Sequence, residues 1–307
     1  MRINNGIWPV MITPFHENAE IDYEGLEKLI EWYLSQGCDG LFAVCQSSEM
    51  FFLSLDERIK LAKAVVTKTA GRASVVASGH VSYSLKDQAK ELSAIADTGI
   101  DGLVLVSNRF VSEKTGSDRE FIDNMKQVLS LLPSDVPLGF YECPYPFKRL
   151  LTPDVLKFCR DSGRFCFIKD TSCDGDNIRE KLEILKGSGV KLFNANTATL
   201  LESLRDGASG YSGVMANFHP VLYKWLYEHW KEQPEKAEEV QSLLSMCALI
   251  EMKKYPACVK RYLRLYEGLP VSDYIRKDNI QPVFCDADDH ELIQLKKLSD
   301  LLVSSLC

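Results

Sequence analysis

The sequence predicts an α/β protein, a (β/α)8 TIM barrel with a C-terminal helical extension. Three observations carry this prediction. Short apolar runs alternate with longer amphipathic stretches through the first two thirds of the chain. Eight such strand–helix units fit into about 230 residues, which is the size of one barrel of this kind. After Pro220 the pattern becomes purely helical.

The predicted strands are the short apolar runs, and in chain order they are Ile7–Thr13, Gly40–Val44, Ser74–Ser78, Gly102–Val106, Pro137–Tyr141, Phe165–Lys169, Lys191–Asn194 and Tyr211–Ala216. Several helical stretches between them have explicit starts. Ser54–Glu57 and Ser117–Glu120 have the pattern of capping boxes, and Thr152 precedes Pro153 as a cap before a first-turn proline. A doubly wound open sheet is the nearest alternative, but no Gly-x-Gly-x-x-Gly motif follows the first strand.

Two regions follow from this order of elements. Residues 1–225 form the predicted barrel, and residues 226–307 form the helical extension. The helices expected near and within the extension are Trp225–Trp230, Glu235–Glu251, Pro256–Tyr266 and His290–Leu302. Because the extension has no strand of its own, we expect it to pack on the barrel rather than to fold as an independent domain.

The composition is that of a soluble globular protein, with 46% hydrophobic and 26% charged residues among 307. The net charge of −7 and the absence of a Lys/Arg block argue against nucleic acid as a partner. No apolar stretch is long enough for a membrane span. The first residues lack the apolar region of a signal peptide, so we expect a cytoplasmic protein.

The 10 cysteines and 5 histidines do not form a metal-binding pattern. No Cys-x-x-Cys and no paired Cys/His spacing occurs among them. We therefore expect reduced thiols that act mostly as small core residues, and no metal site.

Lys169 ends the apolar run Phe165–Lys169, and it is the first candidate for catalysis. A lysine buried without a fixed partner has a lowered pKa, because burial disfavours its charged form. A neutral amine is a nucleophile toward ketones, which is the chemistry of Schiff-base enzymes. A lysine that merely reaches into solvent at a strand end is the alternative.

Polar side chains follow several of the predicted strands. In a (β/α)8 barrel these positions meet at one mouth and build the site. The segments concerned are Cys45–Glu49, Ser107–Arg109, Tyr141-Glu142, Lys169–Ser172, Asn194–Asn196 and Ser212-Gly213. A lysine with a phenol and hydroxyl groups beside it suits a 2-oxo acid, because the phenol can move protons and the hydroxyls can hold the carboxylate. Taken singly, a strand-end tyrosine or a serine turn is more often structural.

Five segments together resemble the dihydrodipicolinate synthase / N-acetylneuraminate lyase family of Schiff-base-forming aldolases and dehydratases, over essentially the whole chain. Gly6–Phe15 resembles its first strand with the Thr-Pro-Phe ending, and Cys45–Glu49 stands where the family has Gly-[Thr/Ser]-Thr-Gly-Glu. Tyr141–Pro144 resembles Tyr-Asn-x-Pro, and Ile168–Ser172 resembles the segment that holds the Schiff-base lysine. Gly207–Pro220 resembles the eighth-strand motif.

The resemblance implies a role for each matching residue. Lys169 would be the Schiff-base lysine and Tyr141 the phenol that transfers protons. Ser47 would be the second hydroxyl of the carboxylate-binding turn, with its backbone N–H and that of Ser48 nearby. The resemblance also implies that two further residues line the floor and wall of the pocket, Thr13 and Ser212.

Four departures from the family pattern concern the second substrate. The synthases carry an arginine for the aldehyde's carboxylate where this chain has Pro146, and Gln46 replaces the first hydroxyl of the turn. Phe110 stands where a neighbouring subunit would contribute a tyrosine, and Glu142 replaces an asparagine. These departures argue against dihydrodipicolinate synthase activity. They leave intact the residues of the site that would form the imine with pyruvate. The candidates to meet another polyhydroxylated or acidic tail are Arg109, Glu142, Gln46, Lys148 and Arg149.

The sequence therefore predicts a lyase that forms an imine between Lys169 and a 2-oxo acid, without a separate cofactor. Retro-aldol cleavage to pyruvate and an aldehyde would use the same intermediate as dehydration of a 2-keto-3-deoxy sugar acid, so both stay open. The resemblance also implies a homo-oligomer, a dimer or tetramer. The alternative function is that of a ligand-binding or regulatory protein that kept the barrel and the lysine but lost turnover.

Overall fold

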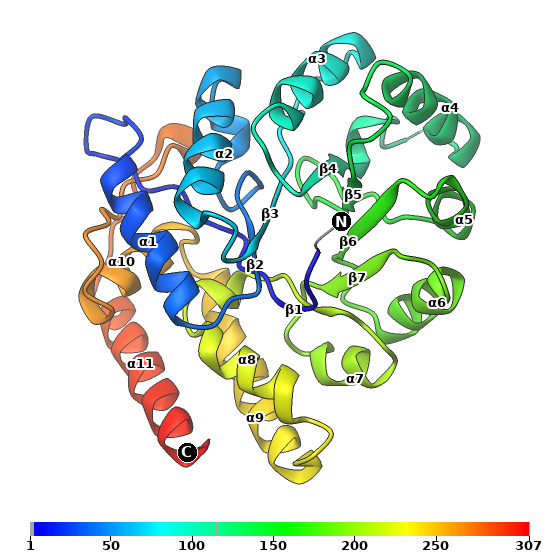
Figure 1. The fold of residues 1–307 in the computed structure, drawn as a ribbon. Coiled ribbons are helices and arrows are strands. Elements are labelled where there is room, and N and C mark those ends of the chain that lie inside the picture. Colours follow the sequence, from blue (N-terminus) through cyan, green and yellow to red (C-terminus); the bar gives the residue numbers. More distant parts are fainter. Residues whose placement is uncertain (1–2, 115, 307) are drawn as a thin grey trace.

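Eight parallel strands form a barrel at the centre of the molecule (Figure 1). The computed structural model describes residues 3–114 and 116–306. The strands are β1 (Gly6–Ile7), β2 (Gly40–Phe42), β3 (Ser74–Ala77), β4 (Gly102–Val106), β5 (Leu138–Tyr141), β6 (Phe165–Asp170), β7 (Lys191–Asn194) and β8 (Gly210–Tyr211). They pair in the order β1-β8-β7-β6-β5-β4-β3-β2, and a parallel bridge between Val10 and Phe42 joins the two ends. The predicted barrel is confirmed.

Helices surround the strands, one after each of them (Figure 1). They are α1 (Tyr23–Ser35), α2 (Leu55–Thr69), α3 (Leu85–Ala96), α4 (Asp118–Leu129), α5 (Pro153–Ser162), α6 (Gly175–Leu185), α7 (Leu200–Arg205) and α8 (Pro220–His229). The capping box of α2 is confirmed, since Ser54 and Glu57 bond each other's backbone N–H. Ser117 caps α4 through the N–H of Glu120. Pro153 begins α5 as expected, but the hydroxyl of Thr152 makes no capping bond.

The first and last strands are much shorter than the sequence predicted. β1 ends at Ile7, shortly before Pro9, which has no N–H to offer a ladder. The predicted strand Tyr211–Ala216 bends after Tyr211 into the short helix η3 (Val214–Asn217). The two strands approach closely, because a Cβ added at Gly210 would lie 1.9 Å from the carbonyl oxygen of Gly6. Glycine is therefore required where the barrel closes.

Aromatic rings fill the inside of the barrel. The ring centroids of Trp8 lie 5.4 Å from Phe167 and 5.3 Å from Phe193, and those of Phe167 and Phe193 are 4.9 Å apart. Side chains alternate along a strand, so Phe167 shares the inward face of β6 with Lys169. Lys169 therefore lies next to the apolar rings of Phe42 and Phe167, which form the apolar floor of the barrel mouth.

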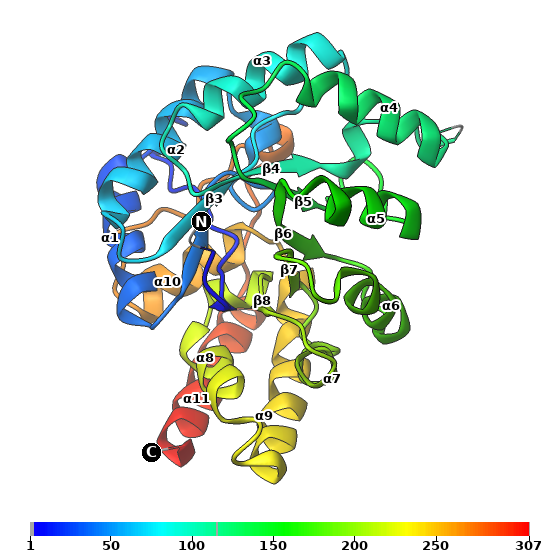
Figure 2. The same ribbon diagram turned by 45° about the vertical axis from the view of Figure 1, so that its right-hand side comes forward.

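The C-terminal extension packs against one side of the barrel. It consists of α9 (Pro234–Cys247), η4 (Ala248–Met252), α10 (Ala257–Tyr266), η5 (Lys277–Asn279) and α11 (Asp286–Leu306). Both views place α9 and α11 beside α8 (Figures 1 and 2). The boundary predicted between residues 225 and 226 falls inside α8, which is continuous and packs on β1. The extension therefore begins after α8.

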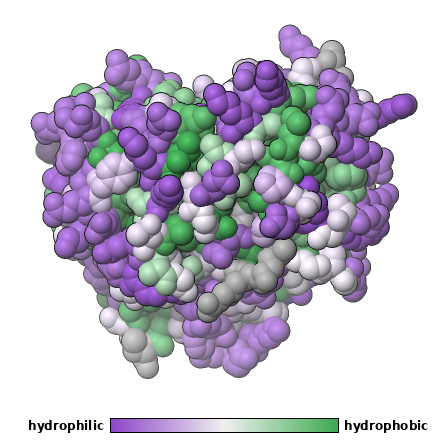
Figure 3. Space-filling model, turned by 45° about the horizontal axis from the view of Figure 1, so that its top comes forward, coloured by the Kyte–Doolittle hydropathy of each residue, from purple (hydrophilic) through white to green (hydrophobic). Residues whose placement is uncertain are grey.

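Figure 3 shows one face of the molecule, on which hydrophobic residues lie in separate patches among hydrophilic ones. None of the helices in the described residues has the length and apolar character that crossing a membrane requires.

Candidate active site

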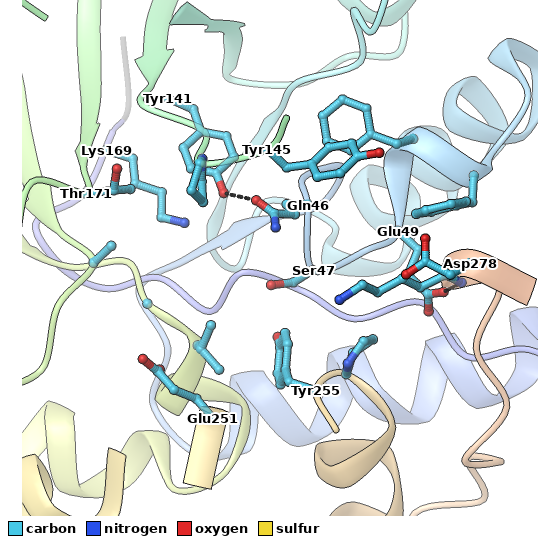
Figure 4. A pocket seen from close by; sticks show the side chains of 18 residues that line it. Gln46, Ser47, Glu49, Tyr141, Tyr145, Lys169, Thr171, Glu251, Tyr255 and Asp278 are labelled. Carbon is cyan, nitrogen blue, oxygen red and sulfur yellow. Dashed lines mark hydrogen bonds between the residues drawn. The ribbon is translucent and has the colours of Figure 1, made fainter. Parts of the chain in front are cut away.

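Tyr141 and Lys169 lie side by side at the carboxyl ends of β5 and β6. The two residues are register partners in the parallel sheet, so their side chains leave the strands on the same face. They border a cavity of about 220 Å³ at this mouth of the barrel. The rest of its wall comes from the turn after β2, the loops after β5, β6, β7 and β8, and the C-terminal extension (Figure 4).

Lys169 is buried and has no charged hydrogen-bond partner among the described residues, with 5% of its surface exposed. Its Nζ lies 4.2 Å from the ring centroid of Tyr141 and 5.9 Å from that of Phe42. Burial lowers its pKa from 10.5 to about 8, against weaker opposing effects of Cys45, Cys143 and Glu251. A useful fraction of the amine is therefore neutral near physiological pH, as a nucleophile requires.

The hydroxyl of Tyr141 points to the side-chain oxygen of Gln46 at 3.4 Å (Figure 4). The thiol of Cys143 reaches the same oxygen, also at 3.4 Å. Burial raises the pKa of Tyr141 well above 10, so the phenol keeps its proton at neutral pH. The long contact to Gln46 leaves this O–H free to turn toward a ligand.

The two serines of the turn after β2 have different surroundings: one lines the cavity and the other bonds the backbone of the turn. Ser47 lines the cavity, as does Tyr255 of the extension. Ser48 instead turns back, where its Oγ donates to the carbonyl of Cys45 at 2.7 Å and accepts from the N–H of Cys45 at 2.8 Å. The hydroxyl of Thr13 donates to the carbonyl of Ser48 at 2.9 Å. Ser48 and Thr13 thus shape the turn behind Ser47.

Ser212 and Arg109 do not line this cavity. Ser212 is fully buried, and its Oγ has no hydrogen-bond partner among the described residues. The guanidinium of Arg109 lies 5.0 Å from the ring centroid of Phe51 and 4.8 Å from that of Tyr83. Arg109 borders a separate surface hollow, beside α3 and α4, so its predicted contact with substrate is not supported by its position.

Glu142 lies on the outer face of the barrel and not in the cavity, because it directly follows the inward-facing Tyr141. Its carboxylate accepts a hydrogen bond from Lys181 of α6 at 2.6 Å, and Asp170 accepts another from the same amine at 2.5 Å. All three side chains are buried. Glu142 also accepts from the N–H groups of Leu151 and Thr171. Three hydrogen bonds thus occupy the Glu142 carboxylate that the sequence assigned to substrate.

The Glu142–Lys181–Asp170 cluster therefore ties the ends of β5 and β6 to α6. Burial lowers the pKa of Lys181, but the two carboxylates raise it further, and the net direction is upward. Burial raises the pKa of Glu142, with Lys181 opposing that effect. Lys181 is thus the charged centre of the cluster.

The two other basic candidates are also held by protein groups. Lys148 donates to the carbonyl of Thr171 at 2.7 Å, and Arg149 pairs with Asp118 at 2.5 Å. Neither lines the cavity.

Two cavity residues that sequence reasoning missed come from the extension. Glu251 in η4 and Tyr255 just after it lie on the side opposite Tyr141 (Figure 4). Burial raises the pKa of Glu251, and attraction to Lys169 opposes this. No local motif marks either residue, because their nearness to Lys169 arises only when the extension packs on the barrel.

Within residues 3–114 and 116–306, no group of three His, Cys, Asp or Glu side chains could hold a metal ion. The described cysteines are all free, and of these only Cys173 and Cys285 are exposed.

Residues 4–295 match the model of the dihydrodipicolinate synthetase family. The 4-hydroxy-tetrahydrodipicolinate synthase of Clostridium tetani is 27% identical over 301 residues, with 97% of each chain covered. That of Methanocaldococcus jannaschii is 24% identical over 301 residues, covering 96% of this chain and 98% of its own.

Solved structures share the fold across the whole chain. YagE of Escherichia coli K12, a prophage protein of the dihydrodipicolinic acid synthase family solved in complex with pyruvate, aligns with a TM-score of 0.82 at 23% identity over the full length of both chains. A monomeric dihydrodipicolinate synthase variant aligns with a TM-score of 0.86 at 20% identity, with 97% of each chain covered.

Proposed function

The chain belongs to the dihydrodipicolinate synthetase family, and we propose that it is a lyase that forms an imine between Lys169 and a 2-oxo acid. One observation carries the proposal. Lys169 is a buried amine with a pKa lowered to about 8, and it faces a small cavity beside a protonated phenol. Buried polar groups that converge on one cavity with a shifted pKa are the physical marks of such a site.

The reaction follows from the amine. Neutral Lys169 attacks the ketone carbon, a carbinolamine forms, and loss of water gives the iminium. In retro-aldol cleavage the C3–C4 bond then breaks, its electron pair enters the iminium as an enamine, and the C4 hydroxyl loses its proton as the aldehyde departs. In dehydration C3 loses a proton and C4 loses its hydroxide. In the cleavage, protonation of the enamine at C3 and addition of water release pyruvate; after dehydration, water hydrolyses the remaining imine.

Three residues of the cavity wall assist this sequence. Tyr141 delivers and removes the proton of the carbinolamine, since its ring centroid lies 4.2 Å from the lysine nitrogen and its phenol borders the same cavity. The side-chain oxygen of Gln46 accepts from the phenol at 3.4 Å, a contact long enough for the O–H to exchange for one with substrate. Ser47, with the N–H groups of its turn, binds the 2-oxo acid's carboxylate, because hydroxyl and N–H donors stabilise an anion.

We propose that the aldehyde or leaving group differs from that of a dihydrodipicolinate synthase. Pro146 occupies the place of the arginine that would bind the aldehyde's carboxylate. Phe110 has no hydroxyl and packs against Phe121 and Phe140, at centroid distances of 5.2 and 6.1 Å. Gln46 cannot relay a proton as a hydroxyl does. We also propose a cytoplasmic homo-oligomer that needs no separate cofactor.

Trapping with borohydride tests the imine. Incubation with pyruvate and sodium borohydride should add the reduced pyruvate mass to Lys169, read by peptide mass spectrometry, because hydride reduces the iminium to a stable amine. An unmodified Lys169 in folded protein at high pyruvate concentration would refute the proposal for pyruvate. Trapping without turnover on a panel of 2-keto-3-deoxy acids and N-acetylneuraminate would instead favour the ligand-binding alternative.

Replacing Tyr141 by Phe should lower kcat by about 100-fold or more, the usual contribution of a positioned proton-transfer group. The final extent of trapping with pyruvate should fall much less, because the amine and the apolar floor are unchanged. Equal turnover of Tyr141→Phe and the unmodified protein would remove the role assigned to this phenol.

A further inference from the structure

Glu251 places a carboxylate on the cavity wall across from Tyr141, within electrostatic reach of Lys169 (Figure 4). It belongs to η4 (Ala248–Met252) of the extension and is only partly exposed. Its carboxylate accepts no hydrogen bond and forms no ion pair with any residue that the structure describes. A partly buried carboxylate without protein partners has its hydrogen-bonding capacity available to a ligand.

The other acidic groups of the cavity wall are placed differently. Glu49 is saturated, since it accepts hydrogen bonds from Lys260 at 2.9 Å and from the N–H groups of Arg276 and Lys277 at 2.6 and 2.8 Å. Asp278 lies in η5 beside Lys277, and Figure 4 shows it at the end of the cavity near Glu49 and away from Lys169. Glu251 is thus the acid that faces the reacting amine.

We infer that Glu251 recognises a hydroxyl group on the substrate chain beyond the imine. The site would then select 2-oxo acids whose chain is hydroxylated and uncharged over those whose chain ends in a second carboxylate. The inference rests on the proposed imine at Lys169 and adds the substrate class. A carboxyl group accepts a hydrogen bond from a hydroxyl when ionised and can also donate one when protonated. A carboxylate tail at the same place would meet like charge at a partly buried position, which is unfavourable.

The rest of the wall agrees with a neutral, hydroxylated tail. Gln46, Tyr145 and Tyr255 offer amide and phenol groups without charge. Apart from Lys169, Lys277 is the one cationic residue among the described residues of this wall, and it belongs to η5 together with Asp278. Asp278 lies at the end of the cavity away from Lys169, so the segment that carries this second cation is at that end (Figure 4).

The test compares three 2-oxo acids in the borohydride assay, which reads imine formation whether the later step is cleavage or dehydration. The probes are pyruvate, 2-keto-3-deoxygluconate with a neutral hydroxylated chain, and 2-oxoglutarate with a second carboxylate. The concentration that gives half-maximal modification of Lys169 is measured for each, counting every adduct mass. The unmodified protein should be labelled at lower concentration by 2-keto-3-deoxygluconate than by 2-oxoglutarate.

Two variants separate the charge of Glu251 from its hydrogen bond. Glu251→Gln removes the charge and keeps a hydrogen-bonding group, so it should lower the half-maximal concentration of 2-oxoglutarate about tenfold, as expected for relief of one like-charge contact. Glu251→Ala should in addition raise that of 2-keto-3-deoxygluconate about tenfold, as expected for loss of a hydrogen bond to a charged group. Glu235→Gln, an exposed acid of α9, is the matched control and should change neither value.

The outcomes distinguish the role of Glu251 from the formation of the imine at Lys169. An unchanged ratio between the two longer acids in both Glu251 variants would overturn the inference while pyruvate trapping still supports the imine. Failure of all three acids to label the unmodified protein would overturn the imine itself. Circular dichroism of each variant establishes that it is folded.

Discussion

Replacing Lys169 by Met should abolish borohydride trapping and turnover while leaving the fold intact. Methionine has a similar length and no amine, and its apolar thioether can pack against the rings of Phe42 and Phe167, which form the apolar floor. The loss should reach the detection limit, because no imine can form at this position. Lys63→Met, which changes an exposed lysine of α2, is the control and should retain full trapping.

The same replacement should make the protein more stable at neutral pH. Burial lowers the pKa of Lys169 from 10.5 to about 8, which corresponds to a cost of about 3 kcal/mol at roughly 1.4 kcal/mol per pKa unit. Between pH 8 and 10.5 the unfolded chain binds more protons at this lysine than the folded protein does, so the cost is fully present below about pH 8 and disappears as the pH rises toward 10.5.

Urea unfolding of the unmodified protein and of Lys169→Met at pH 7 and pH 10 measures this difference. The advantage of the variant should be largest at pH 7 and small at pH 10. The comparison must be made between the two proteins, because Lys260 also has a pKa lowered to about 8, mainly by burial, and titrates in both. An equal difference at both pH values would contradict a lowered pKa at Lys169.

Replacing Lys181 by Met should destabilise the protein by about 3–5 kcal/mol, the usual cost of removing one partner from a buried ion cluster. Glu142 and Asp170 would then lie buried 
side by side without their shared cation. The free energy of unfolding from urea titration, for the variant and the unmodified protein, measures the effect. Lys157→Met, at an exposed pair with Asp154, should cost less than about 1 kcal/mol and serves as control.

A matched triple variant tests the cause of that loss. Glu142→Gln and Asp170→Asn together with Lys181→Met should recover a large part of the stability, since no uncompensated charge remains. Lowering the pH should also reduce the stability difference between Lys181→Met and the unmodified protein. Burial raises the pKa of Glu142, so the penalty for its unpaired charge is greatest above that pKa and is relieved as the carboxylate protonates. A triple variant as unstable as Lys181→Met would show that packing, and not charge, is responsible.

The strand and helix pattern was predictable because each element carries its own local signal. Period and length separated the buried strands from the amphipathic helices, and Ser54 with Glu57 marked the start of α2. The predictions failed at the ends of β1 and β8, where Pro9 and the turn into η3 interrupt regular pairing. Apolar composition alone does not predict where a strand bends or ends.

Apart from Gln46 and Ser47 in the turn after β2, the predicted residues that do line the cavity share one face of neighbouring strands. Tyr141 and Lys169 end their strands in register, so a barrel brings them together. Glu142 is one residue further along, and alternation along the strand sends it to the outer face, where α6 supplies Lys181. Ser48 and Thr13 likewise bond the framework of the turn rather than the cavity.

By itself, the sequence determined the barrel, the helical extension and the lysine with its phenol, because these depend on periodicity and on position within a strand. Only the tertiary structure decided which other side chains face that lysine. Glu251 and Tyr255 lie about eighty residues beyond Lys169 in the chain and come from an element with no strand of its own. Their approach depends on how the extension packs against the barrel, and no local pattern of residues encodes a contact between surfaces so far apart in the chain.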